Sequence, residues 1–353
     1  MKNISFSLIA LFLVSAIHAQ FRADGRTDAL PDGSITLIGA ASSVSYTTPD
    51  ATIRFVLKSG DEHHAYASIE IDGVYSGRIR VEKNQKEYSL KAPNDARAHL
   101  VKIFKATEAT NGPLYFISSP NTLLDEPKPL GKKKIEFIGN SITSGMGNDA
   151  AEIPCGTGEW FDQHNAYWAY GPILSRKLNA QFLLSSVSGI GMYRNWNDEH
   201  IDEAIMPDVY DKLYLTKEST KAFPDTFQPD LVSICLGTND FSDGDGTKPR
   251  LPFNRQKYIA NYIGFVRNIY RKYPKTRIIL LNSPMVSGAK NEVFVSCLKE
   301  VIAAFASDKN HKPISLFEYG PMVPKGCGSH PDIEDHKKMA AQLEATFKKL
   351  LDE

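Results

Sequence analysis

The hydrophobic pattern of the chain changes at residues 125–131, and this change is the strongest constraint on its fold. The segment from Asp125 to Gly131 places two prolines and a glycine among charged residues, which interrupts regular structure. Apolar and polar residues alternate in short runs before it, whereas apolar strand-sized runs and helical patterns take turns after it. At 353 residues the chain also exceeds one typical domain. We therefore expect two domains of different architecture, joined by a linker at residues 126–131.

The first half favours strands. Short stretches alternate apolar and polar side chains as half-buried strands do, and turn residues separate them at close intervals. The candidate strands are residues 52–57, 68–71, 77–81, 99–104 and 114–117. We see no long helical pattern here, so residues 20–125 are predicted to form an all-β sandwich.

The second half, residues 132–353, alternates strands with helices. Strands are expected at 135–138, 182–184, 231–236, 278–281 and 314–317, and helices at 166–178, 256–273, 292–306 and 335–351. Such alternation predicts βαβ units and a parallel sheet with helices on both faces. Sites in open sheets of this class form beyond the carboxyl ends of the strands.

Charge and the N-terminus limit the location and the partners. With 41 basic and 41 acidic side chains, the chain has no broad basic field for binding nucleic acid. Lys2, an apolar stretch at 8–17 and the small residue Ala19 are typical of an export signal. That stretch is shorter than the roughly 20 residues of a membrane span. We expect cleavage of residues 1–19 and a secreted or periplasmic protein with no membrane span.

The cysteines predict no metal site. Cys155, Cys235, Cys297 and Cys327 lack the paired spacing of a zinc framework, and no other metal-ligand cluster occurs in the sequence, so no cofactor is expected. Export permits disulfides, but four thiols allow three full pairings and the sequence does not choose among them. Cys235 and Cys297 lie in apolar runs, where a free thiol can be buried.

Polar residues and glycines follow three of the predicted strands. Ser141 lies in the turn after the first strand, and Gly189 and Asn239 follow two later ones. Each has a simple explanation by itself, Ser141 as a helix cap and the others as turn residues. His330 lies in a loop before the final helix. Acyl transfer needs a nucleophile, a base and oxyanion donors together, and these residues supply all three at strand or loop ends.

These positions resemble the four sequence blocks of the SGNH (GDSL-like) hydrolases, in the segments Gly139–Thr143, Gly189, Gly237–Asp240 and His330. The domain pairing and the local sequence near the Cys327–His330 loop are similar to the second carbohydrate-esterase family. Members of that family join an N-terminal jelly-roll domain to the hydrolase domain. The resemblance implies an α/β fold, a three-layer, flavodoxin-like SGNH hydrolase domain after an all-β sandwich.

The resemblance also implies roles for individual residues. Ser141 would attack an ester carbonyl, and His330 would accept its proton and return it to the leaving alcohol. The oxyanion hole would combine the backbone N–H groups of Ser141 and Gly189 with the side-chain amide of Asn239. Asn140 stands where aspartate is commoner in the family, with little expected consequence for the chemistry.

The chain lacks the family's usual acid. Members place it three or two residues before the histidine, where this sequence has Cys327 and Gly328. In some members a backbone carbonyl just before the histidine orients the ring, and the carbonyl of Ser329 would fill that place. We therefore predict a Ser141–His330 dyad. Asp332 and Asp335 are nearby alternatives that follow the histidine, and we expect them to cap the last helix.

Acetylated plant polysaccharide, such as xylan or glucomannan, is the substrate that the resemblance implies. Trp160 and Trp196 lie in loop-like segments where an indole could stack on a sugar, although core packing is the alternative for each. With Asp240 they are the candidate substrate-binding residues, whereas Trp168 should face the sheet. Two other functions stay open: an SGNH esterase, lipase or thioesterase for other acyl groups, and a non-catalytic carbohydrate-binding protein.

Overall fold

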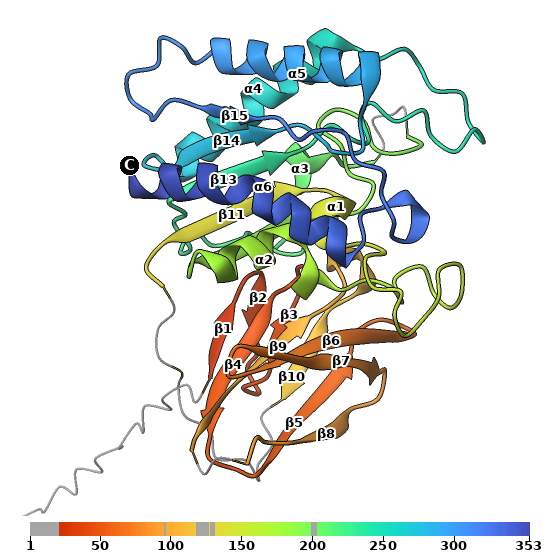
Figure 1. The fold of residues 1–353 in the computed structure, drawn as a ribbon, viewed down its shortest axis with the longest axis vertical. Helices are drawn as coiled ribbons and strands as arrows, with labels where there is room; N and C mark the ends of the chain where they lie inside the picture. The colour runs from red at the N-terminus through yellow and green to blue at the C-terminus, as the bar shows by residue number, and fades with distance from the viewer. Residues whose placement is uncertain (1–20, 95–96, 118–126, 128–130, 199–202) are drawn as a thin grey trace, which may run out of the picture.

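The structure is a computed structural model that describes residues 21–94, 97–117, 127, 131–198 and 203–353. The predicted export signal and most of the predicted linker lie outside the described residues. The described part forms a β-sandwich domain and an α/β domain, stacked one on the other along the long axis of the molecule (Figure 1).

The N-terminal domain consists of two antiparallel five-stranded sheets. One has the order β1 (Arg22–Asp24), β4 (Ser43–Thr48), β9 (His99–Lys105), β6 (His64–Ile71), β7 (Val74–Glu82). The other has the order β2 (Thr27–Ala29), β3 (Ile35–Leu37), β10 (Leu114–Ile117), β5 (Thr52–Ser59), β8 (Lys86–Lys91). Alternate residues such as Ile53, Phe55 and Leu57 face the shared core, as the sequence pattern predicts. The predicted sandwich is confirmed.

The second domain is built on one parallel sheet of five strands. Its order is β12 (Gln181–Ser186), β11 (Lys134–Gly139), β13 (Leu231–Cys235), β14 (Arg277–Leu281), β15 (Ser315–Phe317). Helices α2 (Tyr170–Lys177) and α6 (Ile333–Asp352) cover one face, and α4 (Arg255–Lys272) and α5 (Gly288–Ala303) cover the other (Figure 1). The short helices are α1 (Ser141–Ser144) and α3 (Met206–Val209), with 3-10 turns η1 (Ala109–Asn111), η2 (Ala166–Trp168) and η3 (Cys327–Ser329). The predicted three-layer architecture is confirmed.

The helix predicted at residues 166–178 is in fact two elements. Ala169 is extended, with φ −68° and ψ 153°, and separates η2 from α2. Pro172 explains the break, since its ring has no N–H to donate to the preceding turn and is tolerated only near the start of a helix. Restarting the helix at Tyr170 places Pro172 in the first turn.

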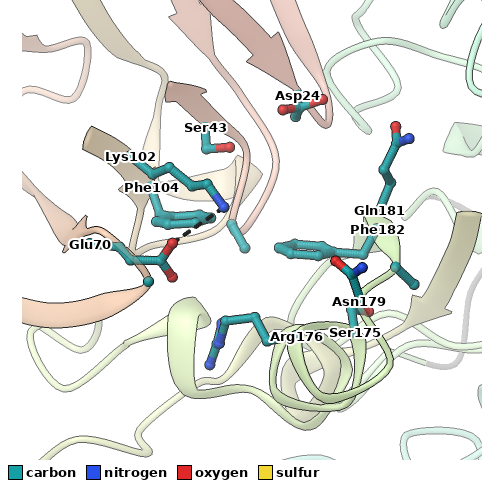
Figure 2. A pocket seen from close by; sticks show the side chains of 13 residues that line it. Asp24, Ser43, Glu70, Lys102, Phe104, Ser175, Arg176, Asn179, Gln181 and Phe182 are labelled. Carbon is teal, nitrogen blue, oxygen red and sulfur yellow. Dashed lines mark ion pairs between the residues drawn. The ribbon is translucent and has the colours of Figure 1, made fainter. Parts of the chain in front are cut away.

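The interface between the two domains combines polar and aromatic contacts. Its contacts include a 2.6 Å bond between His64 Nε2 and Asp162 Oδ1, both nearly buried. A cavity of about 260 Å³ lies in the same interface (Figure 2). The ion pair between Lys102 and Glu70, 3.2 Å long, lines it from the sandwich side, and Arg176 lines it from the α/β side. Neither Ser141 nor His330 lines this cavity, so it is separate from the candidate active site.

Candidate active site

Three adjacent strands of the parallel sheet end at the same edge. Strand β11 pairs in parallel with β12 on one side and β13 on the other, and its last residue lies level with the last residues of both. Ser141 follows β11 by two residues, and Gly189 and Asn239 follow β12 and β13. The structure therefore places these three predicted residues along the edge where α/β sheets form their sites.

The turn that presents Ser141 is tight. Gly139 allows it, because a Cβ atom there would lie 2.0 Å from Thr143 Oγ1. Asn140 caps α1 by accepting a hydrogen bond from the Ile142 N–H at 3.2 Å. Ser141 is the first residue of α1, so its own N–H has no acceptor within the helix.

His330 reaches Ser141 from the loop before α6. Its Nε2 lies 2.8 Å from Ser141 Oγ, and its Nδ1 lies 2.8 Å from the main-chain carbonyl oxygen of Gly328. An Nδ1–H that donates to this carbonyl leaves Nε2 as the acceptor for the serine proton. The described residues place no carboxylate on Nδ1, which agrees with the geometry of the predicted dyad.

The orienting carbonyl belongs to Gly328, so the prediction of Ser329 is wrong. Gly328 and Ser329 both have φ of +59°. This left-handed backbone turns the chain sharply, and the His330 N–H donates to the carbonyl of Cys327 at 3.2 Å. The turn thereby brings the main-chain carbonyl of Gly328 to the ring of His330. A single sequence gives no signal for two consecutive left-handed residues, one of which is not glycine.

The histidine loop is fixed by a disulfide between Cys155 and Cys327, which the sequence could not pair. The Cys327 N–H also donates to the carbonyl of Gly147 at 2.8 Å. Cys235 and Cys297 are buried free thiols.

Asp332 and Asp335 cap the last helix, as predicted. The Asp335 N–H donates to Asp332 Oδ1 at 2.8 Å. Asp335 Oδ2 in turn accepts the Lys325 N–H at 3.0 Å. Both carboxylates are thus occupied by backbone groups around the start of α6.

Gly189 and Asn239 offer N–H groups at the sheet edge. Gly189 has φ of +77°, a conformation that favours glycine, and within the described chain its N–H has no acceptor. Asn239 is 7% exposed, and its Nδ2 donates to the carbonyl of Ile190 at 2.7 Å. That bond uses one of its two amide protons and leaves the other for a ligand.

Asp240, predicted as a candidate substrate-binding residue, is held inside the protein by backbone groups. It is fully buried, and its carboxylate accepts the N–H groups of Met192, Tyr193 and Arg194 at 2.8–3.2 Å. Asp240 therefore shapes the loop after β12. The sequence could not distinguish this role, because a polar residue after a strand is compatible with both.

Two tryptophans are exposed. Trp160 is 49% exposed and rests edge-on against His164 with ring centres 4.9 Å apart. Trp196 is 45% exposed and, with Gly189, lines a groove of about 360 Å³. Trp168 instead packs against the α/β core and contacts Tyr75 of the sandwich.

Burial tunes His330 towards the neutral form. Removal from water lowers the pKa of His330 below its usual value, against the opposing effects of the Gly328 carbonyl and the Glu108 carboxylate. A neutral imidazole at neutral pH can accept a proton from serine.

Comparison with known proteins finds relatives of both domains. Residues 137–326 match the GDSL-like lipase/acylhydrolase family, and residues 23–127 match the carbohydrate esterase 2 N-terminal domain. An acetylxylan esterase/glucomannan deacetylase of Cellvibrio japonicus is 30% identical over 268 residues, covering 71% of this chain and 69% of the relative.

Solved structures extend the likeness to both domains. A family two carbohydrate esterase from Clostridium thermocellum in complex with cellohexaose superimposes with a TM-score of 0.81 at 26% identity, covering 94% of this chain and 99% of the other. One from Cellvibrio japonicus gives 0.82 at 25% identity, covering 95% and 96%.

The chain belongs to the GDSL-like lipase/acylhydrolase family. Within that family it is a carboxylic ester hydrolase of the acetylxylan-esterase type, with the domain composition of the family 2 carbohydrate esterases.

No helix among the described residues is long and apolar enough to cross a membrane. The described residues also contain no group of three metal-ligating side chains.

Proposed function

We propose that the protein is an exported deacetylase that removes O-acetyl groups from plant polysaccharide, such as xylan or glucomannan, or from its oligosaccharides. The observation that carries this proposal is the contact of His330 Nε2 with Ser141 Oγ, made while Nδ1 is held by a main-chain carbonyl. This arrangement can generate a serine nucleophile without a metal.

The reaction has two halves. Ser141 Oγ attacks the acetyl carbonyl while His330 Nε2 takes its proton, and the ester carbonyl oxygen becomes an oxyanion. The N–H groups of Ser141, Gly189 and the Asn239 side chain stabilise that charge. The tetrahedral adduct then collapses, the sugar hydroxyl leaves with the proton from His330, and Ser141 carries the acetyl group. Water, deprotonated by His330, releases acetate and restores the serine.

A carbohydrate substrate fits the surroundings of this site. The groove beside Gly189 also has polar side chains on its wall, including Thr216, Lys217 and Glu218. An exposed indole such as Trp196 offers a flat face to a sugar ring, and the polar wall offers partners for hydroxyl groups. The name of the Cellvibrio japonicus relative, an acetylxylan esterase/glucomannan deacetylase, supports the same substrate class.

Acetate release tests the proposal directly. The wild-type protein and Ser141→Ala would be incubated with acetylated xylan, glucomannan and pectin. We expect acetate from xylan or glucomannan with the wild type and none above background with the variant. Acetate from neither of these two polymers would refute the polysaccharide assignment.

Model esters separate the competing functions. Preference for nitrophenyl decanoate over nitrophenyl acetate would indicate an enzyme for longer acyl chains. No hydrolysis of any ester would leave a carbohydrate-binding protein. Trp196→Ala should weaken hydrolysis of the polymer and leave nitrophenyl acetate unaffected, because the small ester does not need a sugar platform.

A further inference from the structure

A carboxylate of the β-sandwich domain binds the residue next to Gly189. Glu108 lies just after β9, at the start of η1, and is fully buried. Its two oxygens accept the Ser188 N–H at 3.1 and 3.0 Å, and Oε2 also accepts the Ser188 hydroxyl at 2.6 Å. Charge-assisted bonds of this kind are about twice as strong as neutral ones.

Glu108 is itself held rigidly. Thr110 Oγ1 donates to its Oε1 at 2.5 Å, and its own N–H donates to Asn111 Oδ1 at 3.3 Å. The buried ammonium of Lys105 donates to its main-chain carbonyl. The main chain of Glu108 is thus held at its N–H and its carbonyl, and Thr110 holds the carboxylate. A residue held in this way can impose one position on Ser188, and its complete burial keeps it from touching substrate.

We propose that Glu108 is a positioning residue for the oxyanion hole, holding Ser188 so that the next N–H of the chain, that of Gly189, stays fixed and unpaired. This inference rests on the proposed function, because it assigns Gly189 to the oxyanion hole. Hydrogen bonds from three partners hold the loop that contains Gly189. Glu108 holds Ser188, the Trp196 N–H donates to the Gly189 carbonyl at 2.8 Å, and Asn239 holds the carbonyl of Ile190.

The consequence is that the sandwich domain contributes to the chemistry. A positioned donor acts on the transition state and not on the bound ester, so its loss lowers kcat more than it changes KM. The Glu108 carboxylate also raises the pKa of His330 and thus favours the imidazolium that forms during attack.

The test uses Glu108→Gln, which keeps the shape of the side chain but replaces one acceptor oxygen by a donor NH₂. Hydrolysis of nitrophenyl acetate should show kcat lowered by up to about 10²-fold, the loss that a misplacement of about 1 Å can cause. We expect KM within about twofold of the wild type and proportionally weaker inhibition by phenylboronic acid, which forms a tetrahedral adduct with the serine.

Glu70→Gln is the matched control. Glu70 is a buried carboxylate of the same domain that also bonds across the interface, to Tyr167 OH at 2.9 Å, but it does not contact Ser188. The variant Glu70→Gln should lower the midpoint of thermal unfolding without lowering kcat. An equal loss of kcat in both variants would show a general effect of domain docking and overturn the proposal, as would wild-type kcat in Glu108→Gln.

Ser188→Ala tests the contact from the other side if Glu108→Gln does not fold. It removes the hydroxyl bond and keeps the N–H bonds, so a smaller loss of kcat is expected. Where Glu108→Gln does fold, the double variant should lose no more activity than Glu108→Gln alone, because both changes disrupt one contact. Fully additive losses would contradict the proposal. Absence of esterase activity in the wild type would instead refute the proposed function.

Discussion

Cys327 is bonded to Cys155, 172 residues earlier in the sequence, and lies three residues before His330. The position at which the family resemblance led us to look for an acid carries a covalent cross-link. The cross-link joins the histidine loop to the segment that follows α1.

Reduction of this disulfide should impair the enzyme. We expect a lower kcat, because the histidine loop loses its covalent tie, and a free energy of unfolding lower by about 2–5 kcal/mol. Thiol titration of the denatured protein should find two thiols before reduction and four after it. The double variant Cys155→Ala/Cys327→Ala should show the same losses and no further response to reductant. Unchanged kcat in fully reduced protein would contradict this role.

Asn239→Ala should lower kcat about 10²–10³-fold, the usual cost of one oxyanion donor, with a smaller effect on KM. The substitution also removes the bond to the Ile190 carbonyl, so part of the loss comes from the loop. Steady-state kinetics on nitrophenyl acetate measures both constants. A rise in KM with unchanged kcat would assign Asn239 to ground-state binding instead.

Asp332→Ala distinguishes a helix cap from a catalytic acid. Loss of the cap should cost about 1 kcal/mol in the free energy of unfolding and leave kcat within about twofold. Loss of a triad carboxylate would instead lower kcat on the order of 10⁴-fold. Chemical denaturation and steady-state kinetics on the same preparation measure the free energy of unfolding and kcat.

The activity should persist into mildly acidic solution. His330 must be neutral to accept the serine proton, and burial lowers its pKa. The acid limb of kcat/KM against pH should therefore have its midpoint below about 6.5, the ordinary histidine value. The Glu108 carboxylate opposes this shift, so Glu108→Gln should move the midpoint lower still. A wild-type midpoint above 6.5 would exclude this account of His330.

Stability should fall in acid because His336 is buried without charge. Burial lowers its pKa to about 3, whereas the unfolded chain has an ordinary histidine. Between pH 6.5 and 3 the unfolded state binds a proton that the folded state does not. The free energy of unfolding therefore falls as pH decreases, by up to about 1.4 kcal/mol per pH unit. Urea titrations at several pH values give the free energy of unfolding at each pH. Its decrease with falling pH should be less steep in His336→Gln than in the wild type, and equal pH dependence would refute this linkage.

Many of the strands and helices could be predicted because their signals are local. The alternation at residues 52–57 and the apolar run at 231–236 report burial directly, and the residues that follow strand ends fall on one edge of a parallel sheet. Ser141, Gly189 and Asn239 could therefore be placed at this edge from the order of the elements, whereas their roles came from the family resemblance.

The missed features depend on three-dimensional proximity. The pairing of Cys155 with Cys327 and the contact of Glu108 with Ser188 join segments that the chain separates by many residues. Backbone angles that the side chains do not encode decide whether the carbonyl of Gly328 or that of Ser329 reaches the His330 ring. Asp240 looked equally suited to binding a ligand and to holding a loop, and only its burial decided between them.

The Gly328 carbonyl has a consequence for how this enzyme can change. Every residue type carries a main-chain carbonyl, so no single codon change deletes the group that orients His330. A triad acid, in contrast, is lost with one base substitution. Substitutions can therefore disturb the orientation of His330 only through the shape of the loop that presents this carbonyl.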